Sequence, residues 1–71
     1  MPQTFTIKTW RINAKMTQQD VADRLGVSKP TVIKWEREDA VLKNLEVYAL
    51  AYLFGVSVDN IQVKILWPIS L

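Results

Sequence analysis

The chain has 71 residues, 49% of them hydrophobic and 23% charged, with nine Lys and Arg against seven Asp and Glu. A chain of this length forms one small domain and leaves no room for a buried catalytic cavity. Because it contains no Cys and no His, it has no disulfide framework, no thiolate zinc site and no histidine base. We therefore expect no enzyme activity, no metal or other cofactor and no small-molecule substrate. The net charge of +2 permits a polyanionic partner.

The apolar runs are too short for a membrane protein. The longest of them, residues 47–54, has eight residues, whereas a membrane-spanning helix needs roughly 18. Residues 1–6 lack the positive charge and the long apolar stretch of a secretory signal. Together with the absence of Cys, which suits a reducing compartment, this start favours a cytoplasmic protein.

A first helix is predicted over residues 6–15 from the spacing of its apolar side chains. The positions i, i+3, i+4 and i+7 of one helical stripe are occupied by Ile7, Trp10, Arg11 and Ala14. This stripe carries two large apolar groups and a small one, as expected of a helix that packs one side against a core.

A second helix is predicted over residues 18–25, with clear signals at both ends. Thr17 is a natural N-cap, and Asp20 stands three residues later, at the capping-box position. Gly26 follows the helix, where a residue with positive φ ends it at little cost.

A third helix is predicted over residues 29–37. Ser28 can cap it, and Pro30 falls in its first turn, where a missing N–H costs nothing. Val32 and Trp35, spaced i and i+3, give its buried stripe.

An acidic linker, residues 36–39, separates this helix from a fourth one that we expect Asn44 to cap. The fourth helix ends at Gly55, and its predicted buried face consists of Val47, Leu50, Ala51 and Phe54. One more short turn is predicted after it, with Ser57 as its cap and Ile61 packing inward.

The last segment has a different pattern. Between residues 61 and 67 apolar side chains alternate with others, which is typical of a strand, and Pro68 ends the run. Such a strand needs a partner, which can be a second copy of the chain, the segment 4–6 or a different protein. The alternative is a tail that wraps over the helices. We divide the chain into an N-terminal arm (1–5), a helical domain (6–61) and an apolar tail (62–71).

The second and third helices, joined by Gly26 and Val27, form a helix-turn-helix pattern. The run from Thr17 to Glu36, TQQDVADRLGVSKPTVIKWE, resembles the helix-turn-helix of lambda-repressor-like (Cro-type) DNA-binding proteins. The resemblance extends to the stripe of the first helix and to residues 50–59, so it covers about residues 6–61. It implies a compact all-α domain of four to five helices, with a short C-terminal strand or an extended tail. It also implies that Arg11 and Glu36 form an ion pair between the first and third helices.

The resemblance also implies which residues contact DNA. The base-reading face of the third helix would consist of Lys29, Pro30, Ile33, Lys34 and Arg37. Gln18 matches a position that contacts the DNA backbone, and Lys43 can reach a phosphate. Ser28 and Thr31 can add hydroxyl contacts, although both are equally good capping residues. Without the surrounding motif, all of these would be ordinary solvated surface residues.

The expected function is that of a sequence-specific transcriptional regulator of phage or bacterial repressor type, which acts by occupying a double-stranded DNA operator. Two copies on a palindrome are expected, with the C-terminal alternating segment as the candidate dimer surface. Two features favour a different partner. Glu38 and Asp39 place carboxylates in a DNA-facing loop, and Pro30 and Ile33 make the reading face apolar. The alternatives are therefore an antirepressor or modulator that binds a partner repressor protein through this face, and an antitoxin-like regulator.

Overall fold

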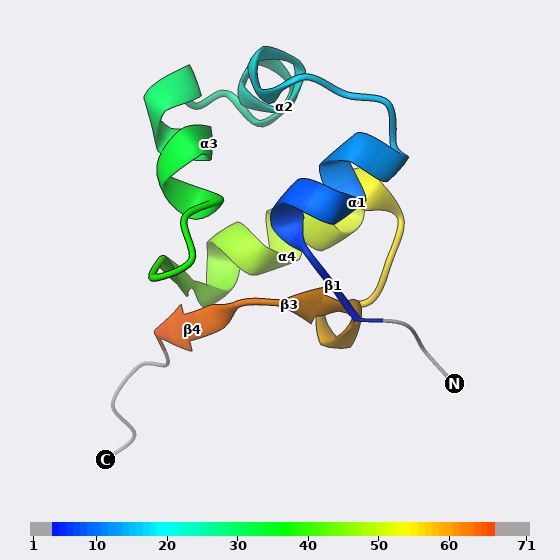
Figure 1. Ribbon diagram of the computed structural model, residues 1–71, viewed down its shortest axis with the longest axis vertical. Helices are drawn as coiled ribbons and strands as arrows, with labels where there is room; N and C mark the ends of the chain where they lie inside the picture. Colours follow the sequence, from blue (N-terminus) through cyan, green and yellow to red (C-terminus); the bar gives the residue numbers. More distant parts are fainter. Residues whose placement is uncertain (1–3, 67–71) are drawn as a thin grey trace.

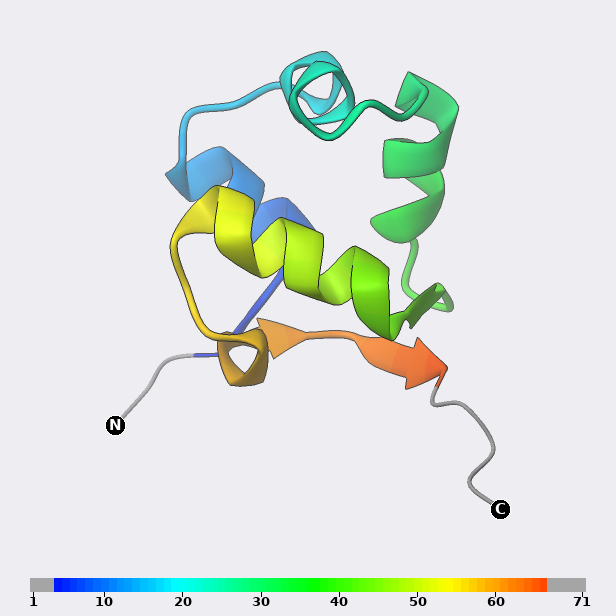
Figure 2. The same cartoon turned by 180° about the vertical axis from the view of Figure 1, so that it is seen from behind.

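The computed structural model describes residues 4–66, which form four helices, one short 3-10 turn and four short strands (Figure 1). In chain order the elements are β1 (Phe5–Thr6), α1 (Ile7–Asn13), α2 (Gln18–Leu25), α3 (Lys29–Trp35), β2 (Val41–Lys43), α4 (Asn44–Phe54), η1 (Val58–Asn60), β3 (Ile61–Gln62) and β4 (Lys64–Leu66). Helices α2 and α3 pack against each other at one end of the molecule, and β3 and β4 run along the opposite side. Seen from behind, α4 lies in front of α1, with β3 and β4 beneath it (Figure 2).

Helix α1 is shorter than the predicted range of residues 6–15. Thr6 stands before the helix as its N-cap, and its hydroxyl accepts a hydrogen bond from the Thr9 backbone N–H at 3.2 Å. At the other end the helix stops at Asn13, and Lys15 adopts a left-handed φ of 59°. The apolar stripe fixes the helix but not its ends, because the residues of the following turn do not interrupt the pattern.

Helix α2 has the predicted bounds, and both of its predicted end signals are confirmed. The Thr17 hydroxyl accepts from the Asp20 backbone N–H at 3.0 Å, and the Asp20 carboxylate accepts from the Thr17 backbone N–H at 2.8 Å. Gly26 closes the helix in the left-handed conformation, with φ 70°, where any residue with a Cβ would be strained.

The capping box makes the stability of α2 depend on pH. Hydrogen bonds from the Thr17 backbone N–H, and secondly from its hydroxyl, hold the pKa of the Asp20 carboxyl below its ordinary value. The unfolded chain therefore binds this proton more tightly than the folded chain. The stabilisation is fully present above the ordinary pKa and is lost as the pH falls through the lowered one. We expect Asp20→Asn to flatten the acid limb of a plot of unfolding free energy against pH. Asp39→Asn, in an exposed loop, is the matched control. Its acid limb should be steeper than that of Asp20→Asn and close to that of the wild type.

Helix α3 begins as predicted and ends two residues early. The Ser28 hydroxyl accepts from the Thr31 backbone N–H at 3.3 Å, which makes Ser28 the N-cap. The last helical residue is Trp35, and Glu36 is the C-cap. The prediction that Arg37 belongs to this helix is wrong, because the chain turns at Glu36 and Arg37 donates its backbone N–H to the Lys34 carbonyl at 3.2 Å.

The N-cap of α4 is Lys43, so the prediction that Asn44 caps this helix is wrong. The helix already includes Asn44. The Glu46 carboxylate accepts from the Lys43 backbone N–H at 2.7 Å, which satisfies one donor at the helix start without a capping hydroxyl or amide. At the far end Gly55 closes the helix with φ 70°, as predicted. Ser57 then caps the predicted short turn η1, accepting from the Asp59 backbone N–H at 3.3 Å.

The prediction of an all-α domain is incomplete, because the structure contains two parallel two-stranded ladders. Strand β3 pairs with β1, in the register Phe5 with Ile61, so the segment 4–6 provides one of the partners expected for the C-terminal strand. Strand β4 pairs with β2, in the register Leu42 with Ile65, and this partner was not predicted. The predicted strand continues to residue 67, which lies outside the described residues.

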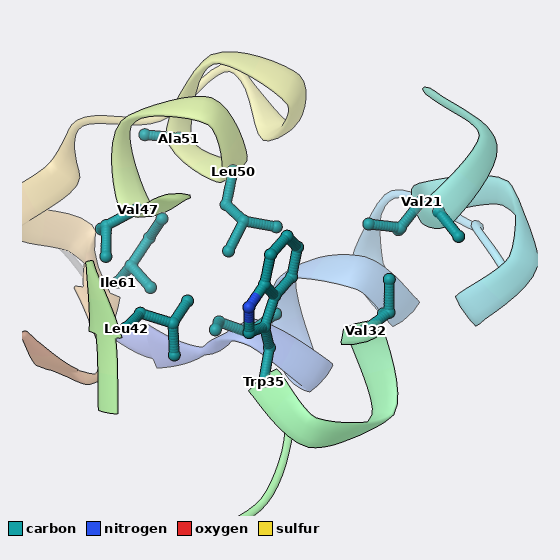
Figure 3. Close-up of a cluster of buried hydrophobic side chains, with 10 residues drawn as sticks. Val21, Val32, Trp35, Leu42, Val47, Leu50, Ala51 and Ile61 are labelled. Atoms are coloured by element: carbon teal, nitrogen blue, oxygen red, sulfur yellow. The ribbon is translucent and has the colours of Figure 1, made fainter. Parts of the chain in front are cut away.

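Side chains from all four helices and from two strands form a single apolar core (Figure 3). Its buried members are Ile7, Val21, Ala22, Val32, Trp35, Leu42, Val47, Leu50, Ala51 and Ile61. The Trp35 indole points from α3 toward Leu50 of α4, so the third helix is packed directly against the fourth (Figure 3). The core thereby fixes the orientation of α3 relative to the rest of the molecule.

Trp10 connects α1 to the two chain segments that flank the core. Its indole Nε1 donates to the Asn60 carbonyl at 2.8 Å, and its ring meets Phe5 edge to face with centroids 5.1 Å apart. The half-buried Trp10 ring therefore links β1, α1 and the turn η1.

Candidate DNA-binding interface

An ion pair joins α1 to the end of α3. Arg11 Nε donates to Glu36 Oε2 at 2.6 Å and Arg11 Nη2 donates to Glu36 Oε1 at 3.2 Å, a two-pronged contact. The two side chains are only 12% and 6% exposed. Arg11 Nη1 also donates to the Met16 carbonyl at 2.9 Å, so the same guanidinium holds the turn before α2. The pair implied by the sequence resemblance is thus present, and it ties both helices of the helix-turn-helix to α1.

Gln18, expected to contact the DNA backbone, is half-buried and belongs to the same network. Its Nε2 donates to Glu36 Oε1 at 3.1 Å, which connects the first turn of α2 to the end of α3. In this protein the Gln18 side chain therefore aligns α2 with α3, and its reach toward a phosphate is limited by this contact.

The outward side of α3 presents four of the five residues expected to read bases. Lys29, Pro30, Ile33 and Lys34 are exposed, and Ile33 is 39% exposed. Val32 and Trp35 occupy the inward side and are buried. The exposed side of α3 therefore carries two lysines and two apolar residues, a combination that suits the donor, acceptor and methyl groups of a major groove.

Ser28 and Thr31 bond to each other at the start of α3. Their hydroxyl oxygens are 2.9 Å apart, in addition to the capping bond from the Thr31 backbone to Ser28. Both hydroxyls thus have a structural role that accounts for their presence, and each retains hydrogen-bonding capacity for a phosphate oxygen.

Lys34 and Lys43, which are distant in sequence, line one groove beside α3. The groove has a volume of about 300 Å³ and is lined by Thr31, Lys34, Trp35, Ala40, Val41, Lys43, Glu46 and Leu66. Two lysines and a threonine line this groove together with one carboxylate, that of Glu46, which accepts from the Lys43 backbone N–H. The contact of Lys43 with a DNA phosphate stays a prediction.

Sequence reasoning did not place Val41, Glu46 or Leu66 beside these lysines. Val41 and Leu66 reach the groove through the pairing of β2 with β4, in which Lys43 stands opposite Leu66. Glu46 reaches it from the first turn of α4, which follows β2 directly. The only sequence signal for this arrangement is the alternating pattern of the C-terminal segment, which predicts a strand but not its partner.

Arg37 does not join the other residues expected to read bases. It lies after the end of α3 and lines a second pocket, of about 290 Å³, together with Glu36 and Glu38. Glu38 and Asp39 are exposed in the same loop. Carboxylates this close to the Arg37 guanidinium reduce the attraction that it offers to a phosphate.

The comparisons agree with this geometry. A family model described as Helix-turn-helix matches residues 7–61 of the chain, from the start of α1 to the first residue of β3. No curated protein matches the chain, and no solved structure matches it. Among the helices of residues 4–66, none has the length and apolar character that a membrane crossing requires. The protein thus belongs to the helix-turn-helix family of DNA-binding regulators, of the Cro and lambda-repressor type.

Proposed function

We propose that the protein is a sequence-specific transcriptional regulator of the phage or bacterial repressor type, which acts in the bacterial cytoplasm by occupying an operator. The observation that carries the proposal is the exposed face of α3, with two lysines and two apolar residues. That helix is fixed to α1 by the Arg11–Glu36 ion pair and to α4 by the buried Trp35. A rigidly held helix with such a face can read base edges in the major groove.

Selection of bound duplexes from random DNA by the purified protein, at near-physiological salt, tests the proposal. We expect enrichment of a palindrome whose half-sites lie one helical turn, about 34 Å, apart. A folded protein that enriches no sequence would contradict the proposal, because sequence-independent contacts to phosphates would then account for all of its DNA binding.

Replacing Lys34 with Ala should weaken operator binding by about 1–3 kcal/mol if its ammonium reads a guanine edge, with relaxed specificity at one base pair. If it contacts a phosphate instead, the loss should be uniform across sequences and the salt dependence should become shallower. Binding isotherms on the selected site and its single-base variants, at several salt concentrations, separate the two results. Lys8→Ala, an exposed lysine on α1, is the control and should change neither quantity.

A second candidate function is that of an antirepressor or modulator. It is favoured by the exposed Ile33 and Pro30 on α3 and by the carboxylates of Glu38 and Asp39 in the adjoining loop. Such a surface suits a partner repressor protein better than a phosphate backbone. The antitoxin-like alternative combines both kinds of binding. In the selection experiment an antirepressor would enrich no DNA sequence alone, and Ile33→Lys would abolish its binding to the partner repressor.

A further inference from the structure

Helix α4 is apolar on all of its sides. Glu46 is its only charged residue, and the Glu46 carboxylate accepts a hydrogen bond from the Lys43 backbone N–H at the start of the helix. One side of the helix is in the core, where Val47 and Leu50 are fully buried and Ala51 nearly so. A helix on the surface of a small protein normally has charged residues on its other side, and a helix without them is normally covered on both sides.

The outer side of α4 is nevertheless exposed in the single chain. Leu45, Tyr48 and Tyr52 are 79%, 57% and 90% exposed. Their spacing of i, i+3 and i+7 places them on one stripe of the helix. In Figure 2 this yellow-green helix faces the viewer, and no described element lies in front of it. We call these three residues the α4 outer face.

The size and chemistry of the α4 outer face fit a second copy of the chain. Its three side chains offer roughly 400 Å² of accessible surface, since an aromatic side chain contributes about 150–250 Å² when fully exposed. A stable dimer buries about 800 Å² on each partner, of which the apolar centre is roughly half and a polar rim the rest. Tyr is enriched at the centre of such interfaces and charged residues are depleted there.

The α4 outer face carries no charged side chain, so pairing through it avoids placing like charges against each other. Two copies that each carry a net charge of +2 repel each other, and they approach most easily through a face without charge. A patch that meets its own copy across a twofold axis needs no complementary partner, because apolar side chains pack equally well against their own kind.

We propose that the α4 outer face is the surface through which two copies of the protein form a dimer. The C-terminal segment, the dimer surface expected from sequence, already has partners within the chain, because β3 pairs with β1 and β4 with β2. The α4 outer face shares no residue with the exposed face of α3, so pairing through it uses none of the residues expected to read bases. The inference deepens the proposed function by supplying the second copy that a palindromic site requires, but the pairing itself needs no DNA.

Sedimentation equilibrium of the full chain, without DNA and over a range of concentrations, tests the proposal. We expect a monomer–dimer equilibrium for the wild type. Tyr52→Glu and Tyr48→Lys should each raise the dimer dissociation constant by about 30-fold or more, as expected for loss of an aromatic anchor and placement of like charges face to face. Circular dichroism should show that both variants keep the wild-type helix content, because neither side chain is in the core.

Ile12→Lys is the matched control, because Ile12 on α1 has the same exposed fraction as Tyr48, 57%. It should leave the dissociation constant within about twofold of the wild type, since it lies outside the interface. A wild type that remains a monomer, or a dimer that survives both tyrosine substitutions, would overturn the proposal. A dimer weakened equally by Ile12→Lys would overturn it too. Because no DNA is present, these outcomes are independent of whether the protein selects an operator.

Discussion

Replacing Trp35 with Ala is expected to cost about 3–5 kcal/mol of unfolding free energy, the range for removing a large aromatic side chain from a core. Trp35 is only 7% exposed, and its indole points into the buried cluster toward Leu50 (Figure 3). The unfolding free energy of a domain of this size is often only about 5 kcal/mol. The variant should therefore be largely unfolded at physiological temperature. Urea denaturation followed by circular dichroism measures the change.

Trp35→Phe should lose less than the Ala variant, because most of the buried volume remains filled. Ile33→Ala is the control on the same helix, and since Ile33 points outward it should change the unfolding free energy by no more than about 0.5 kcal/mol. If Trp35→Ala retained nearly full stability, the cluster around the indole could not be what orients α3. DNA binding by the Phe variant should survive, because its exposed reading face is untouched.

Removing either member of the Arg11–Glu36 ion pair should destabilise the protein by about 3 kcal/mol. Each single substitution to Ala leaves the other charge poorly solvated and unpaired, since the two side chains are 12% and 6% exposed. Arg11→Ala also removes the donor to the Met16 carbonyl, and Glu36→Ala removes the acceptor of Gln18. For a small domain such a loss lowers the midpoint of thermal unfolding by roughly 12–24 °C.

A double-mutant cycle separates the pair from the rest of the network. In a cycle built from Arg11→Met, Glu36→Leu and their combination, the double variant should be more stable than either single variant, because it buries no unpaired charge. Strictly additive effects of the single substitutions would contradict a direct coupling between the two side chains. Lys8→Ala, on the exposed side of α1, is the control for loss of a charge and should have little effect on stability.

The helices could be predicted from sequence because their signals are local. Thr17, Asp20 and Gly26 mark the ends of α2 within a few residues of one another, and the structure contains each of these features. The end of α3 was misplaced because Glu36 and Arg37 are good helix formers by composition. In the structure the helix ends at Trp35, and the carboxylate of its C-cap, Glu36, makes a tertiary contact with Arg11 of α1.

The ladders and the groove could not be predicted, because they depend on contacts between distant segments. Strand β2 has three residues, too few to show an alternating pattern. Its pairing with β4 was therefore missed, and with it the groove that brings Lys43 beside Lys34. The outward direction of Lys29 and Ile33 was predictable, since it follows from the helical period once Val32 and Trp35 are known to be buried. Which of these side chains contacts a base stays a prediction.

The pairing of β1 with β3 has a consequence for how the chain acquires its fold. Phe5 and Ile61 are neighbours in the ladder although nearly the whole domain separates them in sequence. During synthesis the helices can form as they leave the ribosome, but this ladder can close only after residues 61 and 62 have emerged. A contact of such long range carries a large loop-closure cost and slows folding. Until then Ile7 and Trp10 are not covered by the segment 60–62, which packs beside α1 in the folded chain. The nascent chain therefore exposes apolar side chains that a chaperone can bind.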